Sequence, residues 1–69
     1  MKLQDYRRRL GWSQAELARR AKLNANTVRK AENSEPVSSA TAVAIVEALA
    51  QALREQILVE DIDNLKVIL

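Results

Sequence analysis

The chain has 69 residues, enough for one small domain, and 11 Lys and Arg against 9 Asp and Glu give a net charge of +2. Cysteine and histidine are both absent, which excludes disulfide bonds, thiolate or histidine zinc sites and catalysis by a histidine base. The N-terminus lacks the apolar core of a secretory signal, and the most apolar run, residues 40–53, is too short to span a bilayer. We therefore expect a cytoplasmic protein that needs no cofactor.

The charges are unevenly distributed along the chain. Residues 1–34 carry nine Lys or Arg and three Asp or Glu, a net +6, whereas residues 35–69 carry two bases and six acids, a net −4. A basic N-terminal half suits a polyanion such as DNA. A merely solvated surface is the alternative, and it is less favoured because the basic excess coincides with the motif described next.

The first expected helix covers residues 2–10. Leu3, Tyr6 and Leu10 form one apolar stripe at helical spacing, and Gly11 fits the left-handed position that closes a helix. A second helix, about residues 14–20, follows at once.

Ser13 is a good N-cap for this second helix. With Glu16 three residues later it forms the pattern of a capping box, in which each side chain satisfies the other residue's backbone N–H. Trp12 and Leu17 are spaced to pack together as a hydrophobic staple around the cap.

Asn24 repeats this logic as the N-cap of a third helix, from Ala25 to about Asn33, with Leu23 and Val28 at the staple positions. Two short helices with so little chain between them must turn sharply. This is the pattern of a helix-turn-helix unit, which usually inserts its second helix into the major groove of DNA.

After a loop over residues 33–37, Ser38 or Ser39 is expected to cap a longer helix that reaches about Gln56. The expected inward face of this helix consists of Val43, Val46, Leu49, Ala50, Leu53 and Ile57.

The final stretch, residues 57–69, is rich in apolar side chains. We predict a short fifth helix near residues 60–65, although residues 65–68 suit an extended strand equally well. The segment either closes the core of its own chain or forms a two-fold interface with a second copy.

These residues, at this spacing along the chain, resemble the Xre/Cro/cI-type helix-turn-helix repressors. The resemblance covers about residues 3–53, and its most specific parts are the Ser-Gln-x-x-Leu-Ala run that begins at Ser13 and the pair Glu32-Asn33. It implies an all-α, lambda-repressor-like bundle of about five helices. It also implies sequence-specific binding to operator DNA, usually as a dimer on a two-fold site.

The resemblance also assigns roles to residues. Gln14 occupies the position that contacts a phosphate and orients the recognition helix, and the helix N-terminus adds partial positive charge there. Arg7 and Glu32 match a pair that forms an internal salt bridge. Lys22 and Ser34 stand where the family often has Gly, so the turn and the following loop are expected to differ slightly.

The third helix should carry the sequence specificity. Asn26 could bond an adenine through two hydrogen bonds, and Lys30 could donate to guanine. Ala25 could contact a thymine methyl, and Arg29 suits a phosphate. The expected DNA-binding set is Gln14, Asn24, Ala25, Asn26, Thr27, Arg29, Lys30, Asn33 and Ser34. Pure capping by Asn24 and simple solvation of Asn26 and Lys30 are the structural alternatives.

The leading hypothesis is a non-enzymatic DNA-binding regulator, with residues 1–57 as the DNA-binding part and residues 58–69 as an apolar segment of the same domain that supports a homodimer. The alternative is a protein-interaction module on the same scaffold, such as an antitoxin or adaptor that binds its partner through the C-terminal half. No small-molecule ligand and no membrane contact are expected.

Overall fold

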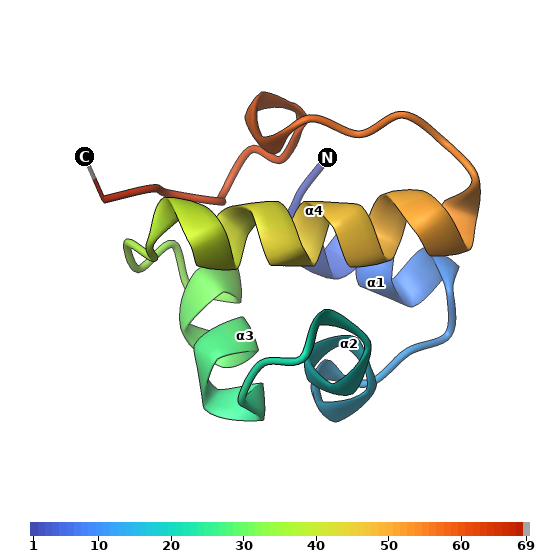
Figure 1. Cartoon of the computed structure of the whole chain (residues 1–69), viewed down its shortest axis with the longest axis horizontal. Helices are drawn as coiled ribbons and strands as arrows, with labels where there is room; N and C mark the ends of the chain where they lie inside the picture. The colour runs from blue at the N-terminus through green and yellow to red at the C-terminus, as the bar shows by residue number, and fades with distance from the viewer. Residues whose placement is uncertain (69) are drawn as a thin grey trace.

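The computed structural model describes residues 1–68 and contains four α-helices in that range (Figure 1). They are α1 (Leu3–Arg9), α2 (Gln14–Ala21), α3 (Ala25–Glu32) and α4 (Ser39–Leu53), followed by a short 3₁₀ turn, η1 (Val59–Asp61). Residues 1–68 form no β-strand, although Val37 and Val67 pair in a single parallel bridge. The expected all-α bundle is confirmed, but the count of about five helices is slightly wrong.

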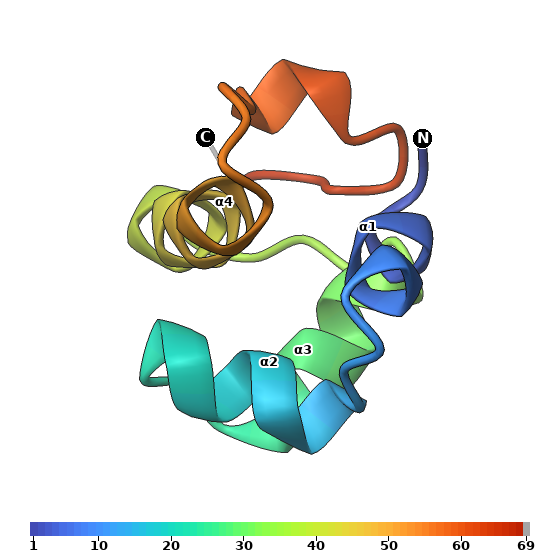
Figure 2. The same ribbon diagram turned by 90° about the vertical axis from the view of Figure 1, so that its right-hand side faces the viewer.

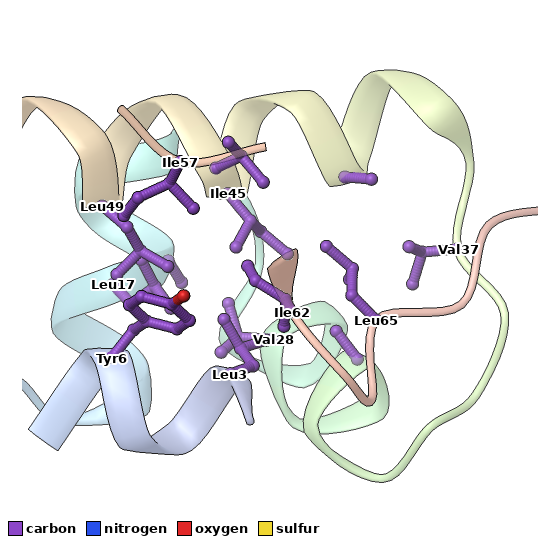
Figure 3. Close-up of a cluster of buried hydrophobic side chains, with 14 residues drawn as sticks. Leu3, Tyr6, Leu17, Val28, Val37, Ile45, Leu49, Ile57, Ile62 and Leu65 are labelled. Carbon is purple, nitrogen blue, oxygen red and sulfur yellow. The ribbon is translucent and has the colours of Figure 1, made fainter. Parts of the chain in front are cut away.

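The elements lie in three layers (Figures 1 and 2). α1 and α4 form the middle layer, α2 and α3 lie on one side of it, and the segment after α4 crosses the other side. Side chains from every layer meet in one core, where Leu3, Leu17 and Ile45 are completely buried (Figure 3). The middle layer therefore separates the helix-turn-helix from the C-terminal segment.

Three of the helix starts are fixed by side-chain caps. Ser13 accepts from the Glu16 N–H at 3.0 Å, Asn24 accepts from the Asn26 N–H at 2.7 Å, and Ser38 accepts from the Thr41 N–H at 3.1 Å. The capping box expected at α2 is half formed. The Glu16 carboxylate binds two arginines of its own helix instead of the Ser13 N–H, because a charged partner makes a stronger bond than a neutral amide.

Every α-helix is followed by a residue in the left-handed conformation. These residues are Gly11, Lys22, Ser34 and Arg54, with φ of 69°, 58°, 64° and 56°. At Lys22 the N–H groups of residues 22 and 23 return to the carbonyls of Arg19 and Ala18, at 3.2 and 2.7 Å, which closes the helix in the usual way. The turn between α2 and α3 therefore keeps its left-handed shape even though it lacks glycine.

α4 differs from expectation in its end and in its rotation. It stops at Leu53 instead of Gln56, and Val43, expected inside, is 46% exposed. Ala42 and Ile45 are buried in its place. The helix is apolar on almost every side, so the spacing of its apolar residues does not determine which side faces the core. Packing against α2 determines it.

The expected fifth helix does not form. Residues 59–61 make one 3₁₀ turn, and the chain then extends so that the Val37 N–H donates to the Lys66 carbonyl at 2.9 Å. Asp61 accepts from the Leu58 N–H at 2.9 Å, a local bond that favours a turn over an α-helix. Ile57, Ile62 and Leu65 enter the core of their own chain, whereas Leu58 and Ile68 remain exposed.

Candidate nucleic-acid interface

α2 and α3 form a rigid corner at one side of the molecule (Figure 2). Leu17 and Ala18 of α2 and Val28 and Ala31 of α3 are buried, so these helices share the core that α4 covers. The tight turn at Lys22 leaves little freedom in the angle between them. The outer face of α3 is consequently held in a fixed direction.

The expected reading residues lie together on the outer face of α3. Asn24, Ala25, Asn26, Arg29 and Lys30 are all exposed. Thr27 is half-buried, on the side of the helix that turns toward the core. The first turn of α3 therefore presents small and polar groups that a groove could approach closely.

Two of these residues are already bonded to each other. Asn26 Oδ1 accepts from Arg29 Nε at 3.0 Å and also from Arg29 Nη2. Asn24 uses its own Oδ1 as the helix cap. Arg29 thus interacts with the side chain next to it on the helix, which sequence reasoning did not foresee.

Gln14 belongs to a buried network that joins three helices. Its Nε2 donates to Glu32 Oε1 at 3.0 Å. Glu32 also accepts from Arg7 Nε at 2.6 Å and Nη2 at 3.1 Å, and Arg7 Nη1 donates to the Trp12 carbonyl at 2.9 Å. The internal pair that the resemblance implied is present, and Gln14 keeps one amide N–H for another acceptor.

Asn33 and Ser34 lie exposed directly after α3. The backbone N–H groups of Asn33, Ser34 and Glu35 all donate to carbonyls of residues 29–31, at 3.0–3.1 Å. The backbone amides of residues 33–35 are therefore not free to bind a phosphate, because the left-handed turn at Ser34 uses them to close the helix. Side chains alone remain to meet a phosphate there.

The basic surface is partly neutralised by ion pairs. Arg19 and Arg20 both bind Glu16, at 2.5 and 2.7 Å, and Arg20 also lies over the Trp12 ring, 5.1 Å from its centroid. These bonds, with Arg20 contributing most, lower the pKa of Glu16. Of the arginines on α2 and α3, Arg29 therefore carries the charge least compensated by an acid.

Arg9 is likewise engaged. Its guanidinium binds both oxygens of Glu55, at 2.7 and 3.3 Å, which lowers the pKa of that carboxyl and raises the pKa of the arginine. Among the basic residues of α2 and α3, Arg29 and Lys30 thus remain without a compensating acid. Neither forms an ion pair within residues 1–68.

Asn64 has an important structural role that sequence analysis missed. It is 93% buried; its Oδ1 accepts from the Leu3 N–H at 2.7 Å, and its Nδ2 donates to the Glu32 carbonyl at 2.9 Å and to Gln4 Oε1 at 2.8 Å. A polar residue between the apolar Ile62 and Leu65 was the available signal. Asn64 ties the C-terminal segment to the end of α3.

A protein-family model described as a helix-turn-helix domain matches residues 1–58. Comparisons with curated proteins and with solved structures found no significant match. Within residues 1–68 no helix is both long and apolar enough to cross a membrane.

Proposed function

This chain belongs to the helix-turn-helix domain family, and we propose that it is a cytoplasmic transcriptional regulator that binds double-stranded DNA in a sequence-specific manner. In this proposal α3 enters the major groove, no catalytic step is involved, and binding represses transcription. The finer assignment to the Xre/Cro/cI type rests on the sequence pattern around Ser13, Gln14 and Glu32-Asn33.

The outer face of α3 carries this proposal. Ala25, Asn26, Arg29 and Lys30 are exposed on one short helix that is held by a buried corner. Lysine and arginine neutralise phosphates and donate to base edges, while alanine permits close approach. Gln14 and the loop residues Asn33 and Ser34 would flank this helix as contacts to the sugar-phosphate backbone.

The test is selection from a random duplex library at low salt, followed by binding measurements at increasing salt. We expect an enriched motif and an affinity that falls linearly with salt on a double-logarithmic scale, because released counterions drive phosphate contacts. Lys30→Ala should weaken binding, whereas Lys66→Ala, in the segment that crosses the other side of α1 and α4 (Figure 1), should change it little. Absence of any enriched motif would remove the proposal.

We further propose that two copies bind a two-fold site, with half-sites about one helical turn apart. Leu58 and Ile68, 46% and 60% exposed, are the apolar groups that the C-terminal segment leaves for such a contact. Sedimentation of the chain and of a Leu58→Lys/Ile68→Lys double variant at micromolar concentration tests it. A monomer in both samples rejects the dimer.

A protein-interaction module is the second candidate, favoured by one observation. Leu58, Val59, Glu60, Ile62, Asp63 and Leu65 line an open hollow of about 670 Å³ in the segment after α4. An adaptor or antitoxin would use this acidic and apolar face for a partner protein. The second candidate replaces the first if Lys30→Ala and Arg29→Ala leave the activity of the protein in cells intact while Leu58→Lys abolishes that activity.

A further inference from the structure

The first turn of α3 uses its side-chain oxygens internally. Asn24 Oδ1 accepts from the Asn26 N–H at 2.7 Å, and Asn26 Oδ1 accepts from both Nε and Nη2 of Arg29. An asparagine amide has a single oxygen, and arginine can only donate. The orientation of the Asn26 amide is therefore fixed by chemistry, with its oxygen toward Arg29 and its NH₂ group away from it.

Only hydrogen-bond donors therefore remain available to a ligand on this part of the surface. Asn26 keeps the two N–H groups of Nδ2, Arg29 keeps the N–H groups that do not face Asn26, and Lys30 adds an ammonium. All three side chains are exposed. The neighbouring Ala25 offers neither a donor nor an acceptor in its side chain.

We propose that Asn26 and Arg29 act as one reading unit that offers only donors and therefore selects guanine instead of adenine. The proposal rests on the DNA binding proposed above. Guanine presents two acceptors, N7 and O6, in the major groove, whereas adenine presents N7 together with the N6 donor. Asparagine reads adenine by accepting from N6, and here the oxygen that would accept is held by Arg29.

The first experiment locates the base that the unit reads. Library selection with the wild-type chain and with Asn26→Ala identifies the position whose preference relaxes in the variant. We expect guanine there in the wild-type motif. Replacing that guanine by 7-deazaguanine, which lacks the N7 acceptor, should weaken binding about tenfold.

The second experiment releases the Asn26 oxygen. Arg29→Met removes the donors of Arg29 while keeping a long, helix-favouring side chain, and the selected base at this position should change from guanine to adenine. Arg8→Met is the matched control, because Arg8 is an exposed helical arginine on α1. It should leave the preferred base unchanged. Circular dichroism verifies that both variants are folded.

The outcomes separate this inference from the function on which it rests. Adenine at the Asn26-dependent position of the wild-type motif, or guanine retained there in a folded Arg29→Met variant, overturns the donor-only unit and leaves DNA binding intact. A wild-type chain that enriches no motif overturns the proposed function itself.

Discussion

The carboxylate of Glu32 on α3 accepts two hydrogen bonds from the guanidinium of Arg7 on α1, and both side chains are largely buried, 7% and 12% exposed. Gln14 of α2 donates to the same carboxylate. The buried Glu32 carboxylate thus fixes three helices relative to one another. Gln14, the first residue of α2, is the member of the network at the outer side of the corner that α2 and α3 form.

Arg7→Ala should lower the stability of the fold. The substitution leaves the Glu32 carboxylate buried without its cation, and breaking such a pair from one side costs about 3 kcal/mol or more. For a domain of this size the melting temperature should fall by at least about 10 °C. Thermal unfolding followed by circular dichroism measures the change.

Arg9→Ala is the matched control for this prediction. It removes the same type of side chain from the same helix, but its partner Glu55 and Arg9 itself are both more than 40% exposed. An exposed pair contributes little, so the melting temperature should hardly move. Equal losses in the two variants would contradict a special role for Arg7.

Lys22→Gly should stabilise the protein. Lys22 has φ 58° and ψ 43°, a conformation in which the Cβ of an L-residue is crowded by the backbone. Glycine avoids this cost, and we expect a gain of about 1 kcal/mol, a rise of about 4–8 °C in melting temperature. Chemical denaturation with urea gives an independent value.

Lys22→Ala separates backbone strain from the loss of charge. Alanine keeps the Cβ, so it should bring no gain even though it removes the same ammonium. Gly11→Ala should destabilise the protein, because Gly11 has φ 69° and alanine is strained in that conformation. The added Cβ would meet no atom within 4 Å, so the loss would come from backbone conformation and not from a clash. A neutral Gly11→Ala would contradict an account based on backbone conformation.

Asn64→Ala should destabilise the fold by about 2–3 kcal/mol. The substitution leaves the Leu3 N–H and the Glu32 carbonyl without their partner in a buried place, and unsatisfied buried groups carry their full desolvation cost. The midpoint of urea denaturation measures this loss.

Asn64→Asp tests the donor side of the same residue. The carboxylate keeps an acceptor for Leu3 but faces two oxygens, the Glu32 carbonyl and Gln4 Oε1, without a proton to share. We expect destabilisation near neutral pH that is partly relieved in acid as the carboxyl gains a proton. A variant as stable as the wild type would show that the donor bonds contribute nothing.

The carboxyls of Glu16 and Glu55 should titrate below the ordinary value of 4.5. The hydrogen bonds of Arg20 and Arg19 hold the pKa of Glu16 down, and those of Arg9 do the same for Glu55. A pKa that is lower in the folded state contributes stability above the unfolded value, and the contribution is lost as pH falls through the folded pKa. Unfolding should therefore become easier in acid below about pH 4.5.

Carboxyl chemical shifts followed by NMR test this prediction residue by residue. Arg9→Gln should raise the titration midpoint of Glu55 toward 4.5 and leave that of Glu16 unchanged. Arg20→Gln should do the reverse. Midpoints that ignore the removal of the arginine would show that another group causes the shift.

Much of the fold could be predicted because short-range chemistry decides it. The caps at Ser13 and Asn24 and the left-handed closure at Gly11 depend on neighbours a few residues away. These residues can therefore be identified from the sequence, and the predicted bounds of α2 and α3 agree with the structure to within one residue. The pair of Arg7 and Glu32 came from the register of the whole motif.

The errors lie where long-range packing decides. The rotation of α4 could not be derived, because an alanine-rich helix offers several similar apolar faces and the contact with α2 selects one. The partners of Asn64 are 32 to 61 residues away in the chain. The bond between Asn26 and Arg29 was missed for another reason, since sequence analysis treated each residue as a separate contact to DNA.

The bonds of Asn64 also constrain how the protein is made. Ile62, Asn64 and Leu65 complete the core and hold the first turn of α1. A nascent chain therefore has no closed core until residue 65 has emerged from the ribosome. Until then the apolar side chains that Ile62 and Leu65 cover remain exposed, and aggregation competes with folding in this interval.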